Sequence, residues 1–149
     1  MLTINTVPAQ GENTRGFFND SGPIEITSDK LTADSENNKA VFEGNVVAKQ
    51  GKTILKAQWM EVRYTEKGEI KSIHAKGAVS VENLSRKITS AEVIYYKDRG
   101  MIVFTGSPEA TDRNTIIKGT KITYYLDSGN SVVENSYVII KKTEDKDGT

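Results

Sequence analysis

Apolar and polar residues alternate along most of this chain with a period of two, which is typical of β-strands whose side chains point to opposite faces. The alternating stretches are separated by short clusters of Asn, Asp and Gly, which favour tight reversals. No run of ten or more residues follows the helical period. Eight such segments therefore predict an all-β, antiparallel meander. They are 23–34, 39–50, 53–65, 69–83, 87–97, 101–111, 114–126 and 131–142.

The chain contains an internal repeat. Residues 26–64 align with residues 88–126 at a constant offset of 62 and without gaps. Ten positions are identical: Ile26/Ile88, Thr27/Thr89, Ser28/Ser90, Val41/Val103, Phe42/Phe104, Gly44/Gly106, Ala48/Ala110, Thr53/Thr115, Ile54/Ile116 and Lys56/Lys118. Chance similarity between β-rich segments is the alternative. The alignment predicts two similar halves that stack to bury one continuous core.

The stretch "AVFEGNVVAKQG" shows how the alternation works within one segment. Phe42, Val46 and the intervening Gly44 share one face of an extended chain. Glycine inside a strand weakens it and often marks a bend or a close approach. Because the glycine recurs as Gly106, we expect the same bend twice. Pro108 occupies the place of Val46 in the second copy and lacks a ladder donor, so we expect an edge strand or a bulge there.

Composition and charge exclude several classes of function. The 149 residues include 20 basic and 20 acidic side chains, so the basic excess of a nucleic-acid-binding protein is absent. The chain has no cysteine, which excludes disulfides, zinc–thiolate sites and thiol catalysis. No apolar run has the length that is needed to span a bilayer.

Candidate chemistry is sparse. His74 is the only histidine and alternates with apolar residues, so we interpret it as an ordinary strand residue. No glycine-rich loop leads into a helix, so no phosphate cradle is expected. Carboxylate pairs that meet only in the fold are left open by the sequence. We predict no catalytic residue, no metal site and no cofactor.

Both ends of the chain differ from its centre. Residues 1–22 are rich in Asn, Gly, Ser and Thr and predict a flexible leader. Val7-Pro8-Ala9 has the small residues of a signal-peptidase site, so the leader is either a remnant of a secretory signal or an ordinary arm. Residues 143–149 predict a charged, disordered tail, which leaves 23–142 as one domain.

A series of short motifs resembles the OstA-like family of lipopolysaccharide export, and most of all its periplasmic bridge proteins. The motifs are "PIEITSD", then "FEGNV", a Gln-Gly turn and a strand with a central alanine, and later "TG" and "IIKGTKITYYL". In residues, the first copy carries Pro23, Ile24, Ile26, Ser28, Asp29, Phe42, Gly44, Asn45, Val46, Gln50, Gly51 and Ala57. The resemblance covers about residues 23–140. Pro108 and the leader depart from the family pattern.

The resemblance implies a twisted, open, V-shaped β-jellyroll whose apolar interior holds the acyl chains of lipopolysaccharide. It also implies a periplasmic, non-enzymatic protein that stacks head to tail with itself and with LptC-like and LptD-like modules, bridging the inner and outer membranes. Alternation then places the expected lipid-binding side chains inside. They are Ile24, Ile26, Phe42, Val46, Met60, Val62, Val79, Val81, Ile88, Phe104, Ile122 and Tyr124.

Three alternatives remain at this point. The chain could be the periplasmic domain of an LptC-like or LptD-like protein, although no anchor and no following barrel are seen in the sequence. It could be a carbohydrate-binding module that uses aromatic residues such as Trp59 as a platform. It could also be a structural repeat protein that self-assembles and binds no ligand.

Overall fold

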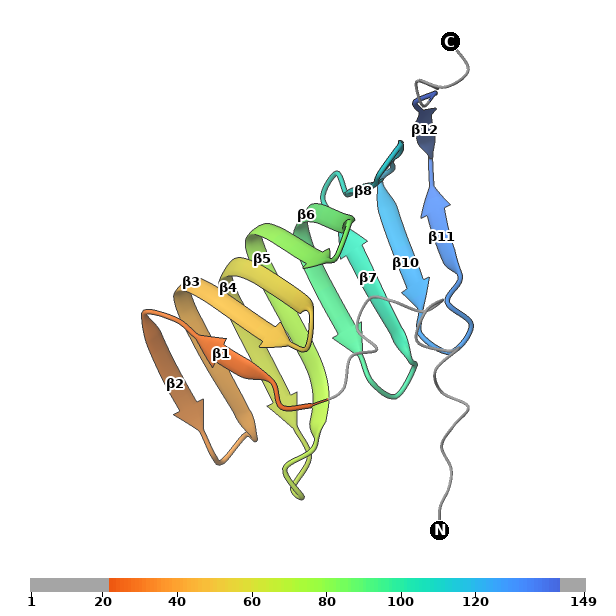
Figure 1. Cartoon of the computed structure of the whole chain (residues 1–149). Coiled ribbons are helices and arrows are strands. Elements are labelled where there is room, and N and C mark those ends of the chain that lie inside the picture. Colours follow the sequence, from red (N-terminus) through yellow and green to blue (C-terminus); the bar gives the residue numbers. More distant parts are fainter. Residues whose placement is uncertain (1–21, 143–149) are drawn as a thin grey trace.

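The computed structural model describes residues 22–142, and every regular element among them is a β-strand (Figure 1). The expected leader and tail lie outside the described residues, except for Gly22. The twelve strands are β1 (Glu25–Thr27), β2 (Lys30–Asp34), β3 (Lys39–Gln50), β4 (Thr53–Tyr64), β5 (Ile70–Asn83), β6 (Arg86–Tyr96), β7 (Met101–Thr105), β8 (Glu109–Asp112), β9 (Thr115–Lys118), β10 (Lys121–Tyr125), β11 (Ser131–Glu134) and β12 (Tyr137–Ile140). All of their pairings are antiparallel, as the sequence predicts.

Four of the eight expected segments are each broken into two short strands. The interruptions are Ser28–Asp29, Gly106–Pro108, Gly119–Thr120 and Asn135–Ser136. Each broken pair still follows one path across the sheet. We call each of the eight paths a stave: β1+β2, β3, β4, β5, β6, β7+β8, β9+β10 and β11+β12.

The staves make two facing layers because every stave bends near its middle. In the first layer, β2, one half of each of β3 to β6, then β7, β10 and β11 pair in order. In the second layer, β1, the other halves of β3 to β6, then β8, β9 and β12 pair in order. Figure 1 shows the long strands β3 to β6 curving from one layer into the other.

The sequence repeat is reproduced in the strand register. Glu25 pairs with Lys49, and 62 residues later Lys87 pairs with Thr111. The same offset relates all pairs of the first stave with β3 to the pairs of β6 with β7 and β8. The two halves are therefore one four-stave unit built twice, as the sequence predicts.

The expected bend is present in both copies. Gly44 and Gly106 both have φ of 84°, and each is followed by a further residue at positive φ, Asn45 or Ser107. A glycine is needed here because an added Cβ at Gly106 would lie 2.3 Å from the Cβ of Ala91. Pro108 lies in the break between β7 and β8 and so interrupts neither of these strands.

A third bend of the same kind was not expected from the sequence. Gly77 and Ala78 in β5 have φ of 88° and 48°, and the β5–β6 register shifts between Lys76 and Val79. These bends, with the interruptions of the other staves, form a line across the sheet that we call the fold line.

Candidate functional site

The candidate site is the space between the two layers, which is lined by rows of apolar side chains. One row crosses the first layer, with each residue paired to the next across neighbouring strands. It consists of Leu31, Phe42, Met60, Ala75, Val93, Phe104, Ile122 and Val133. Every stave thus contributes one apolar residue to the same face.

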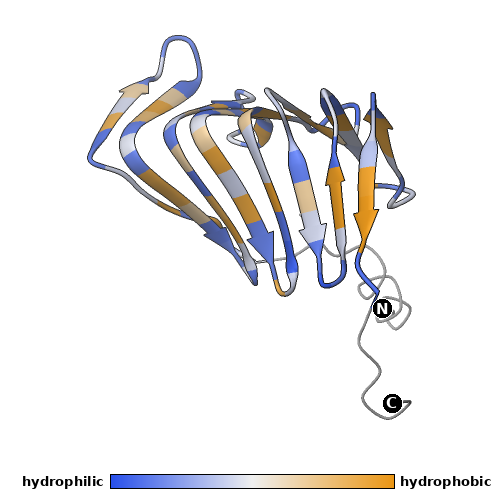
Figure 2. Cartoon of the chain, turned by 90° about the horizontal axis from the view of Figure 1, so that it is seen from above, coloured by the Kyte–Doolittle hydropathy of each residue, from blue (hydrophilic) through white to orange (hydrophobic). Residues whose placement is uncertain are grey.

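A second row crosses the other layer in the same way. It consists of Ile26, Ala48, Leu55, Val81, Ile88, Ala110, Ile117 and Val138. Figure 2 shows hydrophobic positions recurring from strand to strand along the sheet. The two rows give the interior an apolar lining along its whole length.

Burial along these rows is high in the middle and falls at both ends. Ala75 and Phe104 are fully buried, whereas Leu31 on the first stave is 55% exposed and Val138 on the last is 47% exposed. The interior is therefore open to solvent where the sheet ends.

The residues that we expected to face the interior can now be placed. Nine of the twelve are buried, and Ile26 and Phe42 are partly buried against the core. The buried nine are Val46, Met60, Val62, Val79, Val81, Ile88, Phe104, Ile122 and Tyr124. Ile24 precedes β1, is 37% exposed and does not belong to the core cluster.

Alternation alone missed several interior residues. Leu55, Ala57, Ala75, Val93 and Ile102 are all buried in the core. Ile102 lies two positions from Phe104 and would have been found by parity. The bends at the fold line shift the parity of the other strands, so that the faces on the two sides of a bend cannot be joined by simple counting.

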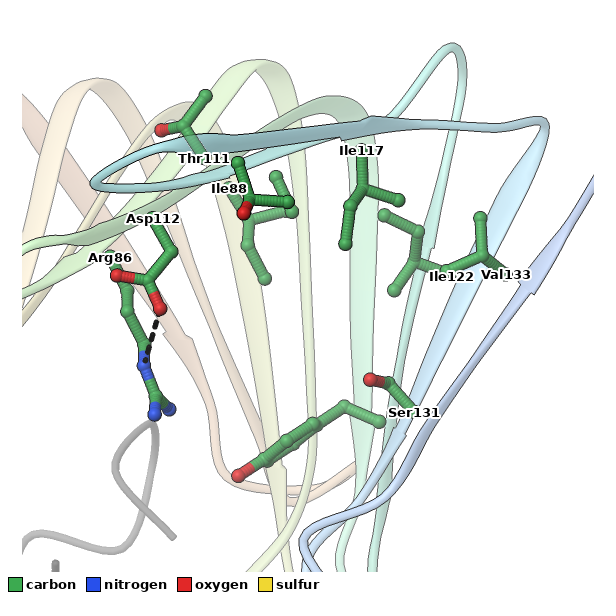
Figure 3. A pocket seen from close by; sticks show the side chains of 11 residues that line it. Arg86, Ile88, Thr111, Asp112, Ile117, Ile122, Ser131 and Val133 are labelled. Atoms are coloured by element: carbon green, nitrogen blue, oxygen red, sulfur yellow. Dashed lines mark ion pairs between the residues drawn. The ribbon is translucent and has the colours of Figure 1, made fainter. Parts of the chain in front are cut away.

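A cavity of about 180 Å³ separates the layers in the second half of the sheet. Ile88 and Ile117 line it from the second layer, and Ile122 and Val133 line it from the first (Figure 3). Tyr124 also lines it from the first layer. Ligand pockets for drug-sized molecules commonly measure about 300–1,000 Å³. This cavity therefore has room for part of a lipid and not for a whole multi-acylated one.

A row of polar side chains crosses the outer end of the second layer. The Asn83 amide donates to the Thr53 hydroxyl at 2.7 Å, and both residues are buried. Arg86 Nε lies 3.6 Å from Asp112 Oδ2 at the cavity mouth (Figure 3). The apolar interior thus has a polar edge.

Tyr95 lies in the first layer between Ile73 and Ile102 and packs against the core. Its partial burial raises the pKa of the phenol above the ordinary value of 10.0, because burial disfavours the phenolate. The surroundings of Tyr95 therefore favour its uncharged form.

The outer face of the first layer carries the only histidine. His74 Nε2 is hydrogen-bonded to Glu92 Oε2, and the His74 ring contacts Trp59 edge-on. The Lys76 ammonium lies 4.6 Å from the centre of the Trp59 ring. Trp59 is thus already engaged, which disfavours its use as a carbohydrate platform.

Within residues 22–142, no group of three or more His, Cys, Asp or Glu side chains is arranged to hold a metal. The described residues also include no helix long and apolar enough to cross a bilayer.

Known proteins with similar sequences or folds agree with this architecture. The crystal structure of LptH from Pseudomonas aeruginosa, described as the LptA-homologous periplasmic component of the lipopolysaccharide transport device, matches with a TM-score of 0.72 and 17% identity. The match covers 80% of this chain and 96% of LptH. It confirms the expected fold, an open antiparallel β-jellyroll.

A curated relative is an uncharacterized protein of Rhizobium meliloti (strain 1021), which is 27% identical over 121 residues. The alignment covers 75% of this chain but only 65% of that protein, which is less than two thirds of its length.

The family described as "LptA/(LptD N-terminal domain) LPS transport protein" matches residues 25–130, which is well over half of the sequence. This range includes both copies of the bend and most of the two apolar rows. The chain therefore belongs to the LptA/LptD N-terminal domain family of lipopolysaccharide transport proteins.

Proposed function

We propose that this chain is a periplasmic carrier that shields the acyl chains of lipopolysaccharide between its two layers, without catalysing a reaction. One observation carries the proposal: two apolar rows cross all eight staves without a polar interruption. Exposing one methylene to water costs about 0.8 kcal/mol, so a lipid with several acyl chains needs a continuous apolar surface. The expected interior residues, from Ile26 to Tyr124, are proposed to make that surface.

The described residues present no catalytic or metal-binding cluster facing the interior, which is compatible with a carrier. His74 is paired on the outer face, away from the interior. Among residues 22–142 the acidic side chains form no metal cluster. A surface of nearly uniform apolar character also lets a lipid move along it without a deep trap.

Both ends of the sheet are suited to association with further modules. Among residues 22–142, six of the eight exposed large hydrophobic side chains lie on or beside the first and last staves. They are Ile24, Leu31, Val132, Tyr137, Val138 and Ile140. Unpaired edge strands bind other strands by β-augmentation. We therefore propose head-to-tail stacking with further copies and with LptC-like and LptD-like modules, which would bridge the inner and outer membranes.

The test is co-elution of the full chain with purified lipopolysaccharide, compared with the same glycan freed of its acyl chains. Ile117 lines the cavity, whereas its neighbour Ile116 points to the opposite face of β9. We expect Ile117→Asp to lower lipopolysaccharide affinity about tenfold or more, and Ile116→Asp to change it little.

Circular dichroism would first show that both variants are folded. Equal binding by both variants, or binding of the deacylated glycan alone, would contradict the lipid-carrier proposal. The second of these results would favour a carbohydrate-binding module.

A further inference from the structure

The two edges of the sheet correspond to the two strands that meet at its centre. Glu134 of β11 pairs with Lys121, as Lys76 of β5 pairs with Trp59. Lys121 is the counterpart of Trp59 in the second repeat, because it lies 62 positions later in the sequence. The last stave therefore occupies, in the second repeat, the place that β5 occupies in the first.

The same correspondence holds in the second layer. Val138 of β12 pairs with Ile117, as Val81 of β5 pairs with Leu55. Ile117 is in turn the counterpart of Leu55, again 62 positions later. The first stave, β1+β2, is likewise the counterpart of β6, because its pairs with β3 match those of β6 with β7 and β8.

Inside the chain, the two repeats are joined where β5 pairs with β6. We propose that two copies of this chain join by repeating that junction, with the last stave of one copy pairing with the first stave of the next. This inference rests on the proposed stacking and specifies its register. The pairs, translated from β5–β6, are Ser131 with Ala33, Val132 with Thr32, Val133 with Leu31, Glu134 with Lys30, Tyr137 with Thr27, Val138 with Ile26, Ile139 with Glu25 and Ile140 with Ile24.

This register brings exposed apolar side chains together. Leu31, which is 55% exposed, meets Val133 at the end of the first row. Ile140, which is 74% exposed, meets Ile24, which is 37% exposed. Ile24 is exposed within one copy because no stave lies beside it, and in the proposed junction the last stave of another copy would cover it.

The same register matches charges on the outer face. Within the chain, Lys76 lies opposite Glu92 at the β5–β6 junction. Between copies the signs are exchanged, with Glu134 opposite Lys30. Within the described residues, neither of these two side chains forms an ion pair. A slip by two residues would lose this pair, and a slip by one would turn the apolar row outward.

The consequence for the proposed carrier is a continuous lining. Leu31 of the next copy would follow Val133 in the first row, and Ile26 of the next copy would follow Val138 in the second. Both rows then run from one copy into the next at the spacing of adjacent strands, about 4.8 Å. A lipid would cross the junction on the same surface that it meets within each copy.

Cysteine cross-linking tests the register, and the absence of cysteine from the natural sequence removes any background. Directly opposed residues in antiparallel strands have Cα atoms about 4.5–5.5 Å apart, which suits a disulfide. Within one copy Leu31 and Val133 lie seven strand spacings apart, roughly 30 Å along the sheet. Only links between copies can therefore form.

We expect the double variant Leu31→Cys/Val133→Cys to give a ladder of linked copies under mild oxidation. The matched control is Leu31→Cys/Ser131→Cys, whose second cysteine is on the same face but two residues out of register. Its Cα separation would be about 7–8 Å, and we expect at least tenfold less linking. Equal or preferential linking of the control would overturn the proposed register.

Charge reversal gives an independent readout by sedimentation. We expect Lys30→Glu and Glu134→Lys each to weaken self-association about tenfold, and an equimolar mixture of the two to restore it. Where the two variants alternate, every junction again joins opposite charges. Lys67→Glu, in the exposed β4–β5 turn, is the control and should have no effect. Failure of the mixture to recover would count against the Glu134–Lys30 contact.

Lipopolysaccharide co-elution of the same variants separates this inference from the proposed function. Binding without any ordered cross-link would overturn the junction and leave the carrier standing. Cross-linking in register without binding would support the junction and contradict the carrier.

Discussion

The two repeats share one register but differ in continuity and in packing. In the first, β3, β4 and β5 run unbroken through both layers over 12, 12 and 14 residues. In the second, the corresponding staves are broken at the fold line, and β8, β9 and β12 have only four residues each. The cavity lies in the second repeat.

The difference shows that one pairing pattern accommodates both continuous and interrupted staves. A continuous strand couples the two layers, because its backbone stays hydrogen-bonded to its neighbours on both sides of the fold line. In the second repeat, three of the four paths cross it through residues that leave the ladder, Pro108 and Gly119 among them. The cavity that Ile88 and Ile117 line lies between the layers of this repeat.

The largest contrast is expected between the two repeated phenylalanines. Phe104 is fully buried, whereas Phe42 is only partly buried near the open edge. We expect Phe104→Ala to lower the free energy of unfolding by about 3–5 kcal/mol, and Phe42→Ala to lower it clearly less. Urea denaturation of both variants measures the difference. Equal losses would mean that the two halves are packed alike.

The two bend glycines should differ next. A Cβ at Gly106 would meet the Cβ of Ala91 at 2.3 Å, while at Gly44 it would meet the carboxylate oxygen of Asp29 at 2.5 Å. A carboxylate can rotate away more easily than a Cβ can move. We therefore expect Gly106→Ala to lower the free energy of unfolding by about 2–4 kcal/mol, and Gly44→Ala to lower it less. Both variants carry the backbone strain of positive φ, so the difference between them reports the close contact.

The control for the bend glycines is Gly100→Ala, in the β6–β7 turn, where the strain of positive φ is present without any neighbour within 4 Å. Thermal unfolding of the three variants ranks the costs. A ranking with Gly100→Ala highest would contradict the role of close approach at the fold line.

Pro108→Val restores the residue that the first repeat has at Val46 and so probes the broken ladder. A hydrogen bond from the new N–H to the neighbouring stave would stabilise the folded state by about 0.5–1.5 kcal/mol. Loss of the proline would destabilise it by about 0.4–1 kcal/mol, because the unfolded chain gains conformational entropy. We expect little net change in stability but slower hydrogen exchange of the amides in β8. Unchanged exchange would show that Gly106 and Ser107, rather than the proline, keep the strand broken.

The smallest effect concerns Tyr95, which lies in the second repeat where the first has Ala33 at the edge. Burial raises its pKa above 10.0, so its contribution to stability is fully present below pH 10 and is lost as the pH rises through the raised pKa. NMR of ring-labelled tyrosine, with Tyr95→Phe for assignment, measures the titration. Filling the interior with lipid should raise this pKa further, and a fall would contradict an apolar ligand beside Tyr95.

Much of the fold follows from the sequence because alternation and the repeat are both local signals. The segment 39–50 is β3 to the residue, and the offset of 62 is kept in the strand pairs. Phe42 and Phe104 were correctly placed on one face by that repeat. The bends at Gly44 and Gly106 were expected for the same reason.

The remaining features depend on contacts that the sequence does not display. Gly77 forms a third bend because Gln58 approaches it from β4, with an added Cβ only 2.8 Å from the Cβ of Gln58. The equivalence of β5 with β11+β12 needs a change of offset and appears only in the pairing. Ile24 looked like an interior residue by parity, but it precedes β1 and has no neighbouring stave to cover it.

The fold line gives the molecule unequal mechanical compliance in two directions. A load along the row of staves is carried by hydrogen-bonded ladders in series, and it can extend the sheet only by breaking those bonds. A load that parts the two layers acts instead on backbone dihedrals at a few bends, such as Gly44, Gly77 and Gly106. A chain of such modules would resist stretching between its ends while each interior widens or narrows around its contents.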